Sequence, residues 1–325
     1  MSYKSTMEEF TRIMQQPHRP FERWSSRWHF GRFRGPISAH QRGILMMLAS
    51  GFLFALMFSI PKLAGGEVNG LQVTFIRYFT GFLTILPIML WRVSRGGSFR
   101  APAWPLIALR ASFGAAGVTC VIYATTHMTY ADALAISFAD GIFVLVLAML
   151  ILGERVSPRR WAAAALSLAG AVIVAQPSPE LLGRVFMEPA AGIAFLGAAI
   201  MAGEVIVIKH LSHRLGAVTL LFYTNMFAVA LLTVPAFYIG DWPPLEDLML
   251  YALMGPVAIA GQFLFIFALR STDVSALVPY KYSTLIYAVL LGIVFFGQWP
   301  DMLTVAGIGL IIFSGVQLSR LEARA

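Results

Sequence analysis

Gly153-Glu154-Arg155-Val156-Ser157-Pro158-Arg159-Arg160 is the stretch that decides the fold, together with a matching stretch 144 residues later, Gly297-Gln298-Trp299-Pro300-Asp301. Each stretch opens with a glycine that ends an apolar run. The first stretch is rich in arginine, whereas the second contains no Lys or Arg. Because Lys and Arg concentrate in the cytoplasmic connections of membrane proteins, the two turns are expected on opposite faces of a membrane.

Apolar runs long enough to cross a bilayer extend on both sides of these turns. A hydrocarbon core of ~30 Å requires ~20 mostly apolar residues per helix. The chain has 325 residues, of which 58% are hydrophobic and only 12% charged, against ~25% charged in soluble domains. We therefore predict an all-α integral membrane protein with ten transmembrane helices. The ten runs are 43–60, 71–91, 104–124, 131–152, 160–175, 190–208, 217–239, 247–269, 274–296 and 302–318.

A weak internal similarity divides these runs into two groups of five. A shift of 144 residues sets Gly117 on Gly261 and Ala124 on Ala268. Because five is an odd number, two such repeats have opposite orientations, and inverted repeats are typical of carriers that alternate access around a central site. The expected organisation is a basic-aromatic cytoplasmic tail (1–42), a first five-helix repeat (43–175), a linker (176–191), a second five-helix repeat (192–319) and a cytoplasmic C-terminus (320–325).

The Lys and Arg residues gather before residue 43 and in alternate connections, which predicts that both termini are cytoplasmic. The expected location is the cytoplasmic (inner) membrane, crossed many times. The net charge of +8 then reflects orientation, and no nucleic-acid partner is expected. The stretch from Phe21 to Arg34 is expected to lie on anionic membrane lipid, with an RNA-binding arm as the alternative.

Three motifs carry a resemblance to a known family. Leu152-Gly153-Glu154-Arg155 closes the fourth run, Ala169-Gly170-Ala171-Val172 lies in the fifth, and Phe75-Ile76-Arg77-Tyr78 lies early in the second. With this two-repeat pattern, the chain after residue 42 resembles the EamA-type drug/metabolite transporter superfamily. The resemblance implies a secondary transporter of small metabolites with a cavity between the repeats. One departure is Gly141, which stands where the family commonly has a proline that breaks the helix.

Small residues in the fifth and tenth runs, such as Ser167, Gly170, Gly307 and Ser314, predict close helix packing. This packing can occur within one chain or between two, so a homodimer stays open.

Charged residues inside the runs point to the candidate site, because a charge at mid-membrane costs ~2.5–3.5 kcal/mol even on the lenient insertion scale. Asp140 lies ~13 Å into its run, too deep for a short carboxylate to reach an interface. The 144-residue shift sets Ser137 and Asp140 opposite Lys281 and Thr284, which predicts a polar centre between the repeats. Arg77 belongs to the family motif and is a further candidate.

The remaining charged and polar residues allow alternatives. Snorkelling toward the interface is expected for Arg110. Glu204 is interpreted as a substrate contact, a gate-side ion pair or an interfacial residue. The other candidate site residues are Tyr280, Tyr282, Tyr287, Gln262 and Asn225.

The predicted function is alternating-access transport of a small zwitterionic or amphiphilic metabolite of amino-acid size, with export favoured over uptake and protons as a candidate coupling ion. Asp140 would bind an ammonium group or a proton, and Arg77 and Lys281 an anionic group. The alternative is uptake of a vitamin or nucleoside-derived cofactor, such as riboflavin or S-adenosylmethionine.

Two other classes compete with a carrier. A channel is disfavoured because a centre with both acidic and basic groups suits an occluding site. The spacing of His127 and Asp132 is compatible with a membrane-embedded acyltransferase, yet no zinc spacing, phosphate-binding loop or nucleophile elbow accompanies it. Neither enzymatic activity nor a cofactor or metal is expected.

Overall fold

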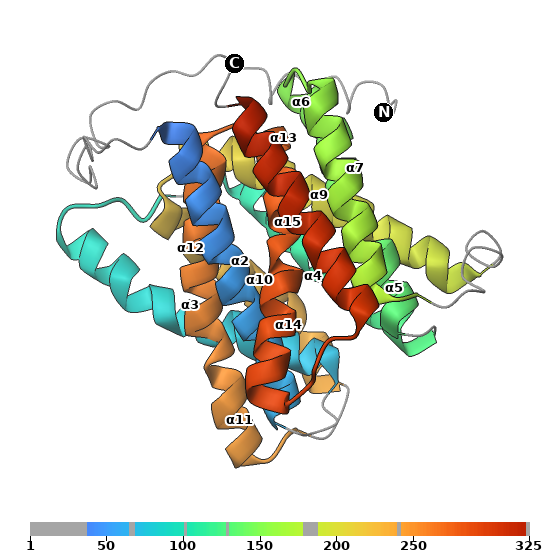
Figure 1. The fold of residues 1–325 in the computed structure, drawn as a ribbon. Coiled ribbons are helices and arrows are strands. Elements are labelled where there is room, and N and C mark those ends of the chain that lie inside the picture. Colours follow the sequence, from blue (N-terminus) through green and yellow to red (C-terminus); the bar gives the residue numbers. More distant parts are fainter. Residues whose placement is uncertain are drawn as a thin grey trace.

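The computed structural model describes residues 38–64, 69–100, 103–127, 130–177, 188–238 and 242–322. Within these residues the chain is helical and has no strand (Figure 1). The expected N-terminal tail lies outside the described residues up to residue 37. The helices are α2 (Ala39–Ala64), α3 (Gly70–Ser94), α4 (Trp104–His127), α5 (Tyr130–Ser137), α6 (Asp140–Leu152), α7 (Pro158–Ala175), α9 (Pro189–Arg214), α10 (Ala217–Tyr238), α11 (Leu245–Ala252), α12 (Met254–Ser271), α13 (Val274–Lys281), α14 (Ser283–Phe296) and α15 (Met302–Glu322).

These helices cover the ten predicted runs, and three of the runs are each covered by two consecutive helices: α5 with α6, α11 with α12, and α13 with α14. In the described part of the chain, nine segments have the length and composition to cross a membrane. Helix α7, 18 residues long with Arg159 and Arg160 in its first turn, is not among these nine segments and covers the fifth predicted run, so the described residues form nine to ten membrane-spanning helices. The protein is therefore a multi-pass helical membrane protein.

The two turns singled out in the sequence have the same local structure. Gly153 ends α6 with φ 69°, and Gly297 ends α14 with φ 62°, a left-handed conformation that glycine adopts without steric cost. The following amide closes each turn in the same way. The N–H of Glu154 donates to the carbonyl of Ala148, and that of Gln298 to the carbonyl of Gly292, both at 3.1 Å. The repeat is thus visible down to its helix caps.

Helices α7 and α15 show that the repeats are inverted. They are the fifth helices of the two repeats and lie side by side (Figure 1), yet they run in opposite directions. Arg160 at the start of α7 pairs with Glu322 at the end of α15 (2.8 Å). Gln176 at the end of α7 bonds Asp301 just before α15 (2.8 Å). The turns after residues 153 and 297 consequently lie at opposite ends of α7.

Small residues allow α7 and α15 to approach each other closely. A Cβ atom on Gly170 would lie 2.7 Å from the carbonyl oxygen of Gly307, and a Cβ on Gly307 would lie equally close to the carbonyl of Gly170. The hydroxyl of Ser167 donates to that of Ser314 at 2.8 Å. The small-residue stripes of the fifth and tenth passes therefore pack on each other within one chain.

The other packing contacts repeat the same symmetry. Helix α2 packs on α12, and α9 packs on α4. Because α2 and α9 begin the two repeats, and α4 and α12 belong to their third passes, these two contacts are equivalent. Helices α3 and α10, the second passes, pack on each other. The largest group of buried apolar side chains lies between the two repeats, with contributions from α2, α6, α9, α10, α12 and α13.

The fourth and ninth passes are broken at equivalent positions. The first break lies at Phe138 and Ala139 and the second at Tyr282, and Phe138 and Tyr282 are 144 residues apart. In the ninth pass, Pro279 has no N–H to continue the helical bonding. In the fourth pass the helix breaks without a proline. The N–H of Gly141 turns to the carbonyl of Phe138 (3.4 Å) instead of the residue four positions back.

Candidate functional site

The two breaks touch each other in the interior of the bundle. The hydroxyl of Tyr282 donates to the carbonyl of Phe138 at 2.7 Å, and the two rings meet edge to face with centroids 6.1 Å apart. Gly141 makes this crossing possible, because a Cβ atom at that position would collide with the Tyr282 hydroxyl. Since Phe138 and Tyr282 are equivalent residues of the two repeats, their contact lies on the approximate two-fold axis of the protein.

An ion pair lies beside this crossing. The ammonium of Lys281 donates to the carboxylate of Asp140. The side chain of Asp140 is buried, whereas that of Lys281 is 32% exposed. Asp140 is the first residue of α6 and Lys281 the last of α13, so each charge is stabilised by the dipole of its half-helix. The helix breaks therefore both position the two charges and lower the cost of keeping them inside the membrane.

The neighbours of this pair in the predicted polar centre, Ser137 and Thr284, donate hydrogen bonds to backbone carbonyls of their own membrane passes. The hydroxyl of Ser137 donates to the carbonyl of Ala133 at 2.8 Å. The hydroxyl of Thr284 donates to the carbonyl of Lys281 at 3.0 Å. Both residues flank the ion pair in sequence, and both satisfy backbone carbonyls close to the breaks.

A second charged group surrounds Arg110 of α4. Its guanidinium donates to the hydroxyl of Thr224 on α10 (2.7 Å) and to the amide oxygen of Gln262 on α12 (3.4 Å), and its Nε lies 3.6 Å from Glu204 on α9. Only 1% of Arg110 is exposed. The expectation that Arg110 snorkels is therefore wrong, because polar partners from three helices hold the side chain in the interior.

Arg77 of α3 also points into the protein. Its Nε donates to the sulfur of Met57 at 3.2 Å, and its guanidinium carbon lies 4.6 Å from the centre of the Tyr78 ring. Glu204 interacts electrostatically with Arg110, with Arg77 and with Lys281, in that order of strength. We call the set of these charged residues the central charge cluster. Its members are Arg77, Arg110, Asp140, Glu204 and Lys281.

Three other predicted site residues make contacts elsewhere. The hydroxyl of Tyr280 donates to the carbonyl of Gly315 on α15 at 3.0 Å. The ring of Tyr287 packs edge to face against Phe52 with centroids 5.6 Å apart. The amide of Asn225 donates to the carbonyl of Leu221 in its own helix at 2.7 Å.

At one end of the bundle, charged side chains fix the short connection between α12 and α13. Glu154 accepts hydrogen bonds from the amides of Val274 (2.8 Å) and Ser275 (3.0 Å) and from the Ser275 hydroxyl (2.7 Å). Arg160 pairs with Asp273 at 2.9 Å. Lys209 of α9 donates to the carbonyl of Thr272 at 2.7 Å. Because α13 ends in Lys281, these contacts hold the half-helix that carries one partner of the central ion pair.

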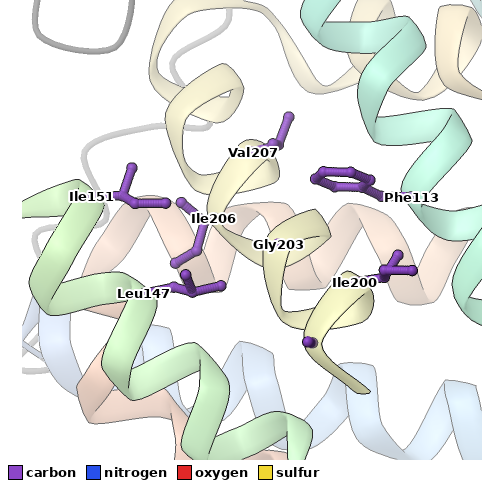
Figure 2. A pocket seen from close by; sticks show the side chains of 8 residues that line it. Phe113, Leu147, Ile151, Ile200, Gly203, Ile206 and Val207 are labelled. Atoms are coloured by element: carbon purple, nitrogen blue, oxygen red, sulfur yellow. The ribbon is translucent and has the colours of Figure 1, made fainter. Parts of the chain in front are cut away.

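An apolar pocket of about 310 Å³ lies on α9, between α4 and α6 (Figure 2). Glu204 of the central charge cluster directly follows Gly203 of its lining, so the apolar and charged regions adjoin on α9. The pocket can accept an apolar group and offers no charged partner of its own. It is lined by Phe113, Leu147, Ile151, Ala199, Ile200, Gly203, Ile206 and Val207.

Sequence reasoning missed Arg110 and Thr224 as members of a buried polar network. The 144-residue shift could not reveal them, because Arg110 and Glu204 are not equivalent positions of the two repeats. The available signal was charge complementarity, because Arg110 and Glu204 are residues of opposite charge that each lie within an apolar run.

Comparison with known proteins agrees with this architecture. The pseudopaline exporter CntI of Pseudomonas aeruginosa is 27% identical over 281 residues, covering 86% of this chain and 96% of the exporter. The S-adenosylmethionine uptake transporter of Rickettsia prowazekii is 25% identical over 286 residues, covering 85% of this chain and 92% of that protein. A solved crystal structure superposes with a TM-score of 0.72 at 19% identity, covering 87% of this chain and 99% of the other.

The similar proteins are named as transporters, in agreement with the expectation of a transporter instead of an enzyme. The model of the EamA-like transporter family matches the chain twice, over residues 41–176 and 189–319. The two matches coincide with the two inverted groups of five passes seen in the structure. The protein is therefore a transporter that belongs to the EamA-like transporter family, within the drug/metabolite transporter superfamily.

Proposed function

We propose that this transporter moves a small zwitterionic or amphiphilic metabolite of amino-acid size out of the cell by alternating access between repeats 43–175 and 192–319. The observation that carries the proposal is the Asp140–Lys281 ion pair at the crossing of two broken helices. In secondary transporters with inverted repeats, broken helices at the repeat interface bind the substrate and the coupling ion.

An ion pair is a suitable receptor for a zwitterion, because a substrate can exchange with it charge for charge. The ammonium of the substrate replaces Lys281 at Asp140, while the carboxylate of the substrate binds the released Lys281. During this exchange both Asp140 and Lys281 keep a partner of opposite charge. Breaking a buried ion pair without such a replacement would cost ~3–5 kcal/mol. The apolar pocket between α4, α6 and α9 is a second compartment for the apolar portion of an amphiphilic substrate.

Proton coupling is proposed at the same ion pair. Protonation of Asp140 would neutralise it and release Lys281, so a proton can take the place of the substrate ammonium.

The end of the bundle that holds Arg160 and Glu322 is assigned to the cytoplasm, in accordance with the concentration of Lys and Arg in its connections. The membrane is then the cytoplasmic membrane, with both termini inside.

The direction of transport rests on the relatives. The similarity to the pseudopaline exporter supports export. The similarity to the S-adenosylmethionine uptake transporter supports the alternative, uptake of a nucleoside-derived cofactor. S-adenosylmethionine carries an ammonium and a carboxylate, so Asp140 and Lys281 would have the same roles. Counterflow of labelled S-adenosylmethionine in proteoliposomes separates the two functions, since a saturable signal would favour the cofactor carrier.

The experiment that tests the site is the substitution Asp140→Asn in purified, reconstituted protein. A thermal-shift screen against metabolites first identifies a stabilising compound, and its counterflow is then measured. We expect Asp140→Asn to abolish counterflow at unchanged membrane abundance. The matched control is Glu246→Gln, which changes an exposed carboxylate at the start of α11 and should transport like the wild type. Unchanged counterflow in the Asp140→Asn variant would remove Asp140 from the binding site.

A further inference from the structure

The central charge cluster contains one more cation than it has carboxylates. Asp140 is paired with Lys281, and Glu204 lies against Arg110. Arg77 is the third cation. It interacts with Glu204 only beyond ion-pair distance, and among the described residues no carboxylate forms an ion pair with it. Because arginine is a cation with five N–H donors and no acceptor, Arg77 gives the cluster a surplus positive charge.

The contacts of Arg77 are those of an incompletely satisfied cation. The thioether of Met57 is a weak hydrogen-bond acceptor, and the ring of Tyr78 provides only a cation–π contact. Both partners are buried, with 1% and 3% of their surfaces exposed, so the guanidinium is directed into the protein. The residue itself remains partly exposed, so burial alone does not prevent a ligand from reaching it.

An unpaired guanidinium inside a membrane protein is costly, and binding an anion removes that cost. A neutral zwitterion that exchanges with Asp140 and Lys281 leaves the net charge of the cluster unchanged. A substrate with one additional carboxylate, in contrast, makes the cluster neutral when bound. A guanidinium also pairs with a carboxylate through two parallel hydrogen bonds, which gives this contact directional specificity.

We infer that the transported metabolite carries a net negative charge, and that its surplus carboxylate binds Arg77. This inference rests on the proposed function, since it assumes that the substrate occupies the Asp140–Lys281 site. It adds a substrate class, an amino acid-like molecule with more carboxylates than ammonium groups, and a role for Arg77 as the residue that selects this class.

A test without any substrate compares the thermal stability of two arginine variants. Arg110→Gln leaves Glu204 buried without its cation, and we expect its Tm to fall by more than about 5 °C. Arg77→Gln removes a cation that has no carboxylate partner, and we expect its Tm to equal or exceed that of the wild type. A fall in Tm for Arg77→Gln as large as that for Arg110→Gln would show that Arg77 already has an anionic partner and would overturn the inference.

A second test measures the preference for charge directly. The purified protein, in phosphatidylcholine vesicles that offer no anionic headgroup, is screened for thermal stabilisation by the near-isosteric pairs glutamate with glutamine and aspartate with asparagine. We expect the acid of at least one pair to stabilise the wild type at least tenfold more potently than its amide. Arg77→Gln should abolish this preference, and Arg77→Lys should retain part of it.

The inference is overturned if no acid stabilises the protein, if the amides are as effective as the acids, or if Arg77→Gln preserves the preference. These outcomes are separable from a failure of the proposed function. Loss of counterflow in Asp140→Asn together with equal stabilisation by acids and amides would retain the site and discard only the net negative charge.

Discussion

Replacing Glu154 by alanine tests how strongly the α12–α13 connection is held. The carboxylate of Glu154 accepts three hydrogen bonds from the first residues of α13, at 2.8, 3.0 and 2.7 Å. Loss of an N-terminal cap costs about 0.5–2 kcal/mol, and loss of a carboxylate from a helix N-terminus about 0.3–1 kcal/mol more. Because Glu154 is partly exposed, we expect a total near ~2 kcal/mol.

Thermal denaturation of the purified protein in detergent measures this loss. At ~2–4 °C per kcal/mol for large domains, the expected loss of ~2 kcal/mol means that Glu154→Ala should lower Tm by about 4–8 °C. Glu154→Gln should have a smaller effect, because its amide oxygen retains one acceptor, and glutamine is the residue at the equivalent position 298. Arg155→Ala is the matched control, since the neighbouring Arg155 is exposed. Equal Tm values for Glu154→Ala and the wild type would refute this account of the connection.

Two further predictions concern the crossing and the opposite end of α7. Gly141→Ala places a methyl group against the Tyr282 hydroxyl, so we expect loss of counterflow and a lower Tm. Adding Tyr282→Phe removes that hydroxyl and should restore both in part. Failure of this rescue would contradict the steric explanation. At Asp301, hydrogen bonds from the Thr304 backbone amide, the Thr304 hydroxyl and Gln176 lower the pKa of the carboxyl group. Its stabilising contribution is therefore complete above the ordinary pKa near ~4 and is lost as the pH falls through the lowered value. The Tm difference between wild type and Asp301→Asn should stay constant from pH 7 to 5 and shrink below pH 4, and a constant difference at pH 3 would contradict this assignment.

Much of the architecture followed from patterns of period and charge. The apolar runs predicted the passes. The contrast between the arginine-rich turn at 153–160 and the turn at 297–301, which has no Lys or Arg, predicted the inversion that α7 and α15 display. A polar centre between the repeats, with Asp140 and Lys281 among its residues, was predicted from one repeat shift, because a two-fold axis brings equivalent depths together. The passes, the inversion and the polar centre each depend on patterns that extend over the whole chain, so weak local signals were sufficient to predict them.

The parts that could not be predicted depend on side-chain direction. The depth of Arg110 alone permits either snorkelling or burial, and only the positions of Glu204, Thr224 and Gln262 around it decide for burial. Likewise, Tyr280 is next to Lys281 in sequence, but the rotation of α13 turns its hydroxyl toward α15. Rotations of helices about their axes are set by packing, and a single sequence contains little information about them.

The hydroxyl of Tyr282 on the Phe138 carbonyl has a consequence for leakage of ions through the membrane. If either half-helix tilted alone, that carbonyl would lose its donor in an apolar interior, at about 1–3 kcal/mol. A movement in which both half-helices tilt together would keep this hydrogen bond and would avoid that cost. In the proposed alternating-access cycle, this bond would couple the movements of the two half-helices, so we expect the site to open to one side of the membrane as it closes to the other, without a continuous aqueous path.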